Sequence, residues 1–215
     1  FDKKERIMCF YMGQKEPPVK VEKRFNAKVD QLEAFLQADY IIGFEFPKVP
    51  VILNTAPEII TTQYHWGLVP TWSKDLDFRK NTLNARIETL EEKPSFKNVT
   101  TNRCLVIASS FFEWHWNDEK GKSKDKYQIF SAEEELFAMA GIYDTWHNPQ
   151  QGINYHSFAI VTTAANKQME YIHNHKKRMP IMLKKGDEAA WLDATNAFQE
   201  FAFPYSAEMV SFKVS

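Results

Sequence analysis

Cys9 directly follows Met8, and this pair offers the most distinctive chemistry in the chain. If Met8 is the translational start, its removal leaves Cys9 with a free α-amine beside a thiol. An unperturbed α-amine has a pKa of about 8, so part of it is neutral and nucleophilic in a cell. The amine can form a Schiff base with an aldehyde, and the thiol can then close on the imine carbon to give a thiazolidine. Cys9 is therefore the first candidate nucleophile.

Glu113 is the second candidate, because it follows Phe111 and Phe112 and precedes Trp114. Aromatic neighbours desolvate a carboxylate, which raises its pKa and prepares it to move protons near neutral pH. The pattern is equally compatible with a glutamate at a strand end that faces water.

The histidines give one candidate pair, His173 and His175, on either side of Asn174. On a strand the two rings would face the same side and could hold a metal, but no third ligand has convincing spacing. Cys104 lies in an apolar run, where a cysteine is usually a small buried side chain. The other histidines are expected to be structural or exposed; they are His65, His115, His147 and His156.

Two polar segments could bind a sugar-phosphate backbone. If residues 84–88 are extended, Asn84, Arg86 and Glu88 share one face, which suits a phosphosugar. The alternative is a surface ladder with an Arg–Glu pair. Lys176, Lys177 and Arg178 form a basic cluster that could contact phosphates or could simply be solvated.

The segment of residues 66–72 places Trp66 and Trp72 around Gly67 and Pro70. A rigid aromatic loop of this kind can stack on a nucleobase. The alternative is that the loop plugs the core.

Composition limits the classes of protein that remain. The 215 residues include 27 basic and 28 acidic side chains, so the net charge of -1 excludes a globally basic nucleic-acid coat. Hydrophobic residues make up 44%, which favours a packed core, and 2 cysteines exclude a disulfide framework. No apolar run approaches the roughly 20 residues of a membrane span, and the charged start is no secretory signal. We expect a soluble cytoplasmic protein.

Short apolar runs predict strands that dominate the middle of the chain, with helices at intervals. Because the two do not alternate regularly, the pattern favours an α+β fold over a doubly wound parallel sheet. Asn26 is expected to cap a helix that carries Val29, Leu32, Phe35 and Leu36, and Asp187 to cap another. Strands are expected at residues 104–107, 127–130, 136–140, 157–161 and 179–183. Residues 117–126 are expected to form an exposed hairpin loop, and residues 198–202 a last short helix.

Taken in order, these motifs resemble the SOS-response-associated peptidase (SRAP) family, the abasic-site processing proteins. The resemblance implies a single compact α+β domain over residues 8–215, with a barrel-like, mainly antiparallel sheet flanked by helices. Residues 1–7 would then be a leader or a mis-assigned start. The matching pieces are Met8-Cys9, residues 66–72, 84–88, 112–114 and 140–143 with Trp146, residues 162–166, Ile172-His173 and residues 178–180.

The resemblance also implies roles for individual residues. The nucleophile falls on Cys9, the residue that orients the cysteine and the sugar on Asn84, the proton-shuttling carboxylate on Glu113, and the acid/base on His173. No metal or cofactor is implied. The residues expected to contact DNA or hold the site beside it are Trp66, Pro70, Trp72, Arg86, Thr162, Lys176, Lys177 and Arg178.

The implied activity is binding of single-stranded DNA that carries an abasic site, followed by a thiazolidine cross-link through Cys9. The cross-link would protect the lesion during the DNA damage response. Weak lyase activity and a proposed self-cleaving peptidase activity come with the resemblance. We also expect a monomer in the bacterial cytoplasm, associated with the nucleoid when the protein acts.

Three features depart from the family pattern. Residues 1–7 precede Met8, and a start at Met8 is favoured because residues 3–6 can be encoded entirely in purines, like a ribosome-binding site. Phe10 and Tyr11 replace the usual Gly-Arg, and either ring could stack on a base. Extra residues between His173 and Arg178 leave open whether His173 or His175 is the acid/base, and we favour His173.

Three other functions are compatible with the sequence. A cysteine hydrolase would use Cys9, His173 and Asn84 and would need no free α-amine. A non-catalytic single-strand-binding module would use the tryptophan loop and the basic cluster. A metal-binding protein would use His173 and His175.

Overall fold

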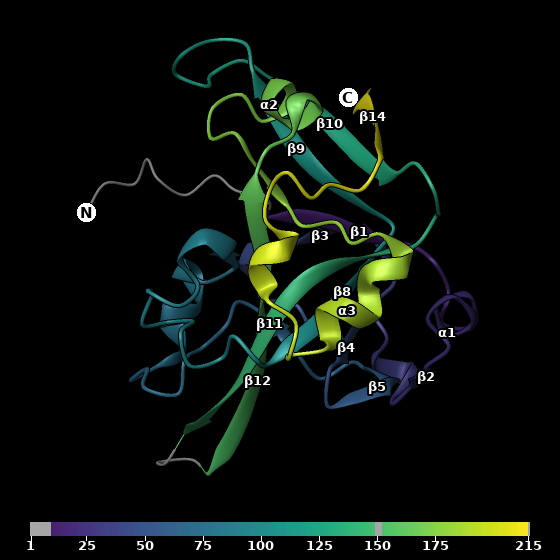
Figure 1. Ribbon diagram of the computed structural model, residues 1–215, viewed down its shortest axis with the longest axis vertical. Coiled ribbons are helices and arrows are strands. Elements are labelled where there is room, and N and C mark those ends of the chain that lie inside the picture. The colour runs from purple at the N-terminus through teal and green to yellow at the C-terminus, as the bar shows by residue number, and fades with distance from the viewer. Residues whose placement is uncertain (1–9, 149–151, 215) are drawn as a thin grey trace.

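Two β-sheets and a layer of short helices build the fold, which confirms the α+β expectation (Figure 1). We analysed a computed structural model that describes residues 10–148 and 152–214. The sheets are mainly antiparallel, and in the described chain each is open at both ends rather than closed on itself. The barrel-like arrangement is therefore a stack of two open sheets. No helix in these two ranges is long and apolar enough to cross a membrane.

The smaller sheet has five antiparallel strands in the order β14-β10-β9-β1-β3. Its middle strand carries Glu113, and the neighbouring strand β1 begins at Tyr11. The strands are β1 (Tyr11–Gln14), β3 (Ala38–Ile42), β9 (Ser110–Trp116), β10 (Lys124–Ser131) and β14 (Met209–Val214).

The larger sheet has nine strands, seven of them in the order β13-β12-β11-β8-β4-β5-β2. Two short strands, β6 and β7, pair in parallel with β12. The bounds are β2 (Lys28–Val29), β4 (Val51–Leu53), β5 (Ala56–Thr61), β6 (His65–Trp66), β7 (Asn84–Arg86), β8 (Arg103–Ala108), β11 (Phe137–Asn148), β12 (Ile153–Ala164) and β13 (Arg178–Pro180).

The helices are short and lie between strands. The α-helices are α1 (Pro18–Phe25), α2 (Lys167–Ile172) and α3 (Glu188–Leu192). The 3-10 turns are η2 (Leu32–Ala34), η3 (Gly43–Glu45), η4 (Leu76–Asn81), η5 (Ile87–Thr89), η6 (Lys185–Asp187) and η7 (Phe198–Phe201).

Most of the expected elements are confirmed, and one helix was wrong. Strands occur at the first four expected segments, β13 covers only the start of the fifth, and the exposed hairpin loop lies between β9 and β10. Asp187 occupies the position before α3 as expected, although its side chain makes no capping hydrogen bond. Asn26, however, ends α1 with a φ of 50° instead of beginning a helix. Asparagine tolerates this left-handed conformation, and Pro18 is well suited to the first turn of a helix.

Strand alternation places apolar side chains on both faces of the larger sheet. Cys104 and Val106 of β8 belong to the core between the two sheets, whereas Leu105 and Ile107 pack with Trp191 on the helical side. Cys104 is fully buried, as expected, and burial raises the pKa of its thiol. The larger sheet is thus the middle layer of three.

The smaller sheet buries one face only. Met12, Phe111 and Ile129 point into the core between the sheets and are 0% exposed. On the opposite face, Tyr40 is 38% exposed and Phe212 is 60% exposed. The two faces of this sheet therefore differ in their exposure to solvent.

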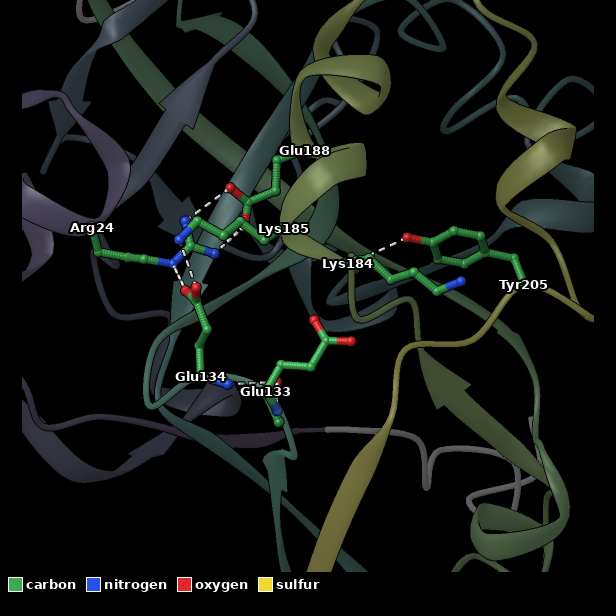
Figure 2. Close-up of polar contacts among 8 residues, drawn as sticks. Arg24, Glu133, Glu134, Lys184, Lys185, Glu188 and Tyr205 are labelled. Carbon is green, nitrogen blue, oxygen red and sulfur yellow. Dashed lines mark hydrogen bonds and ion pairs between the residues drawn. The ribbon is translucent and has the colours of Figure 1, made fainter.

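A charged network fastens α1 to α3 (Figure 2). The guanidinium of Arg24 donates to both carboxylate oxygens of Glu188 at 2.7 and 3.1 Å and forms an ion pair with Glu134. Lys185 binds the other side of Glu134 at 2.6 Å. Burial raises the pKa of Glu188, although the hydrogen bond from Arg24 opposes this shift. Because these charges satisfy one another, the network serves the fold.

Candidate functional site

Glu113 lies on the inward face of β9, beside the core residue Phe111. Its side chain is almost fully buried, with the residue 1% exposed. The desolvated position suggested by its aromatic neighbours is therefore observed, and the water-facing alternative is excluded. Burying a carboxylate is costly unless it has polar partners, so its surroundings must supply them.

His173 supplies one such partner from the C-terminal end of α2. Asn166 begins this helix by accepting a hydrogen bond from the backbone N–H of Met169 at 2.9 Å. The helix ends where the N–H of His173 donates to the carbonyl of Met169 at 2.7 Å. This short, well-capped helix places the His173 ring in the interior, where the residue is 1% exposed.

The two buried side chains meet. His173 Nε2 lies 3.8 Å from Glu113 Oε2, within the range of an ion pair when the ring is protonated. His173 Nδ1 lies 2.8 Å from the carbonyl oxygen of Arg178. Because a carbonyl only accepts hydrogen bonds, Nδ1 must carry the proton there, so Nε2 is the nitrogen that can gain or lose one. We call this arrangement the Glu113–His173 pair.

Cys9 lies outside the described residues. The first described strand after it in the chain is β1, which begins at Tyr11. Tyr11 pairs with Phe112, the residue immediately before Glu113. Phe10 is fixed just before this point, because its carbonyl accepts from the N–H of Gly43 at 2.8 Å and its ring packs on Phe44.

Strand β12 gathers three further residues of the candidate site. Asn84 and Arg86 on β7 lie opposite Ile160 and Thr162 of β12. Asn84 is 8% exposed and Thr162 is 1% exposed. Thr162 therefore holds neighbouring strands, while Arg86 remains exposed at the surface.

Arg178 closes this region from the other side through an ion pair that spans 90 residues of sequence. Its guanidinium donates to both Glu88 oxygens at 2.7 and 2.8 Å, and to the backbone carbonyl and hydroxyl oxygens of Thr162 at 2.9 and 3.2 Å. Burial alone would raise the pKa of Glu88, but the hydrogen bonds and charge of Arg178 outweigh it and lower the pKa. We call this arrangement the Arg178–Glu88 clamp.

The clamp corrects two expectations. Glu88 does not extend a ladder with Asn84 and Arg86, because the chain turns into η5 after Arg86. Arg178 is occupied by internal partners, so its guanidinium is structural rather than a ready phosphate contact. Thr162 lies buried beneath this guanidinium, a position from which it can help to hold the site as expected.

Only part of the tryptophan loop, residues 66–72, is exposed for stacking on a base. Trp66 is 0% exposed and donates its indole N–H to Leu83 O at 2.9 Å, and Pro70 is buried too. Gly67 has a φ of +115°, which turns the chain after Trp66. The expectation that Trp66 and Pro70 contact DNA is therefore corrected: they form the core plug. Trp72 is 49% exposed and stays a candidate contact.

Lys176 and Lys177 lie in the turn between α2 and β13. Lys177 is exposed with a φ of 51°, and Lys176 is half-buried. Unlike Arg178, neither forms an ion pair within the described chain. They remain candidate phosphate contacts, together with Arg86 and Trp72.

Asn174 is a residue whose role the sequence did not indicate. Its side-chain amide accepts from the backbone N–H of Trp116 at 3.0 Å and donates to the Trp116 carbonyl at 2.9 Å. The amide thereby ties the turn after His173 to the end of β9, the strand that carries Glu113. Asn174 follows His173 directly, so this bridge connects both members of the Glu113–His173 pair.

His175 points to a different place from His173. Its ring stacks on Trp116 at 3.7 Å with an interplanar angle of 6°, and Lys124 Nζ lies 4.7 Å from the same indole ring. Burial, then Lys176 and Lys124, lower the pKa of His175. His173 and His175 do not lie on a strand, so the assumption that their rings face the same side and could hold a metal together was wrong. Within the described residues no group of three His, Cys, Asp or Glu side chains could hold a metal.

Comparison with known proteins identifies the class to which this fold and site belong. The family model of the SOS response associated peptidase (SRAP) matches residues 8–215, and the chain belongs to this family.

Among its relatives is the abasic site processing protein YoqW of Bacillus subtilis, 38% identical over 170 residues, which are 76% of this chain and 73% of that protein. The chicken (Gallus gallus) abasic site processing protein HMCES is 35% identical over 161 residues, 63% of this chain and 46% of that protein. A crystal structure of a Bacteroides thetaiotaomicron protein superposes with a TM-score of 0.86 at 32% identity, covering 96% of this chain and 92% of that one.

Replacing Asn174 by alanine tests the bridge to β9. Asn174→Ala removes two hydrogen bonds and leaves the backbone polar groups of Trp116 without them, so we expect about 1–2 kcal/mol less unfolding free energy. Urea denaturation measures this difference. Asn117→Ala, on the exposed hairpin loop nearby, is the matched control. Equal stabilities of the two variants would show that the Asn174 bridge does not hold β9.

Proposed function

We propose that this protein binds single-stranded DNA at an abasic site and forms a covalent thiazolidine with it through Cys9, once Met8 has been removed. The relatives named abasic site processing proteins support the DNA lesion as the substrate. The observation that carries the chemistry is the Glu113–His173 pair, two titratable side chains 3.8 Å apart in a buried position.

Chain connectivity supports the assignment of Cys9 to this pair. Successive Cα atoms are 3.8 Å apart, so the Cα of Cys9 is within about 7.6 Å of the Cα of Tyr11. Tyr11 pairs with Phe112, the neighbour of Glu113. A nucleophile two residues before Tyr11 is therefore within reach of the groups that would move its protons.

The first step is attack on the open-chain aldehyde of the abasic sugar. His173 delivers a proton through Nε2 to the ring oxygen, which favours opening, while Nδ1 stays bound to the Arg178 carbonyl. The neutral α-amine of Cys9 then attacks C1′. Glu113 takes up and returns protons as water leaves, which gives the Schiff base.

The second step makes the product resistant to hydrolysis. The Cys9 thiol adds across the C=N bond, so a C1′–S bond forms, the nitrogen regains a proton and no other group leaves. The sugar is then held in a five-membered ring. A Schiff base that does not close can undergo β-elimination, so the same site would also have a weak lyase activity.

The remaining residues hold the reactants. Asn84 orients Cys9 and the sugar, and Thr162 with the Arg178–Glu88 clamp fixes β7 and β13 on β12. Trp72, Arg86, Lys176 and Lys177 contact the strand outside the reaction centre. If residues precede Cys9 in the newly made chain, their removal is required, and self-cleavage next to Cys9 would be the peptidase activity that the family name describes.

A cross-linking assay tests the proposed function. The protein that begins at Cys9 is incubated with a single strand that holds one abasic site and then analysed by denaturing gel and intact mass. We expect a heat-stable adduct with the mass of both partners less one water. Cys9→Ala should form none, and the same strand without the lesion should not react. An adduct from Cys9→Ala would contradict the assigned nucleophile.

Glu113→Gln tests the proton transfer. The amide keeps the shape of the side chain but cannot shuttle a proton, so we expect cross-linking to slow by about 100-fold. Affinity for an undamaged strand should be unchanged. Glu119→Gln, on the exposed hairpin loop, is the control and should react at the normal rate. Single-turnover gel assays give these rates, and an unaltered rate for Glu113→Gln would remove its assigned role.

A further inference from the structure

The outward face of the smaller sheet carries a group of aromatic side chains that the reaction does not use. Tyr11 of β1 and Phe112 of β9 lie opposite each other, with Trp114 two residues further along β9. Tyr40 lies on β3, and Lys126 of β10 lies opposite Trp114. All five point away from the core, because they alternate with the inward residues Met12, Ile41, Phe111, Glu113 and Tyr127. We call these five side chains the aromatic platform.

The rings of the platform contact one another closely. Tyr11 stacks on Tyr40 with centroids 5.2 Å apart and an interplanar angle of 23°. Trp114 meets Tyr11 edge-on at 4.7 Å, and Phe112 meets Tyr40 edge-on at 4.8 Å. Such contacts fix each ring in place, so the surface is ordered before any ligand arrives.

Lys126 gives this aromatic surface a positive charge. Its ammonium nitrogen lies 4.3 Å from the ring centroid of Tyr40 and 4.8 Å from that of Phe112. Lys213 of the same sheet binds the carboxylate of Asp125, but Lys126 makes no ion pair within the described chain. Its charge is therefore available to an anionic ligand.

The platform is also accessible. Tyr40 is 38% exposed, and Trp114 and Tyr11 are half-buried. Phe112 is 5% exposed, yet it belongs to neither core cluster, since its cover comes from Tyr40 and Lys126. The helical layer lies on the far side of the larger sheet.

We propose that the aromatic platform binds unpaired nucleotides next to the lesion, with a base stacked on Tyr40 and Tyr11 and a phosphate beside Lys126. Stacking rings that alternate with cations are the usual means of holding single strands without sequence preference. The platform lies on the face of the smaller sheet opposite Glu113, and Tyr11, two residues after Cys9 in the chain, belongs to the strand that continues from Cys9. The platform deepens the proposed function, and it rests on that function for placing the lesion at Cys9.

Binding of an undamaged strand tests the platform separately from the chemistry. The full chain is titrated into a fluorescein-labelled oligothymidine, and the dissociation constant is read from fluorescence anisotropy. Tyr40→Leu keeps an apolar side chain but loses the ring, so we expect affinity to fall by about tenfold. Tyr40→Phe should restore it. Lys126→Met should reduce the slope of log Kd against log salt by about 0.7, as expected for one phosphate contact on a single strand.

Phe212→Ala is the control, because Phe212 is exposed on the same sheet but lies on β14, at the edge away from β1. Its affinity should equal that of the wild type. Unchanged affinity of Tyr40→Leu, or no binding by the wild type, would overturn the platform. Cross-linking by the wild type with normal affinity of Tyr40→Leu would keep the proposed function and reject the platform. Weakened binding by Tyr40→Leu, together with no adduct from the wild type, would support the platform and reject the proposed function.

Discussion

The burial of the Glu113–His173 pair determines how the strands and helices around it must be arranged. A carboxylate and an imidazole that are each 1% exposed lose most of their contact with water, and they must be held by the protein itself. Glu113 is fixed by the centre of the smaller sheet, and His173 by a helix that Asn166 starts and by the carbonyl of Arg178. This burial costs folding free energy. It also desolvates two titratable groups, which suits them to proton transfer.

The surrounding architecture explains how so short a helix can hold a buried histidine. Strand β12 lies in a sheet that is packed on both faces, and it aligns β7 on one edge and β13 on the other. The Arg178–Glu88 clamp joins these segments over Thr162, while Asn174 ties the turn after His173 to β9. Both sheets therefore contribute to one site, and the contacts between them fix its geometry.

Local patterns predicted much of this arrangement, and contacts between distant residues account for the rest. The apolar run around Cys104 correctly indicated a buried strand, because that burial depends on neighbouring residues. The aromatic neighbours of Glu113 left a desolvated and a water-facing carboxylate equally open, and only the packing of the two sheets decides for the desolvated one. The sequence could not show that Glu88 binds Arg178 rather than Arg86, since that pair joins residues 90 positions apart. Nor could it tell a buried Trp66 from an exposed Trp72, because burial depends on how η4 and β12 pack. Asn26 was misassigned because asparagine is favoured at both ends of helices.

In the proposed reaction the α-amine at position 9, with its protons moved by the buried pair, makes the bond to the abasic sugar. The most direct measurement compares two forms of the protein, one beginning at Phe1 and one beginning at Cys9, with the same abasic single strand. Intact mass and a denaturing gel report the adduct. A time course of intact mass shows whether the form that begins at Phe1 first loses the residues before Cys9. We expect a heat-stable adduct from the Cys9 form and none from an untrimmed Phe1 form. An equal adduct on the intact Phe1 form would contradict the proposed reaction, because no free amine would then be present at Cys9.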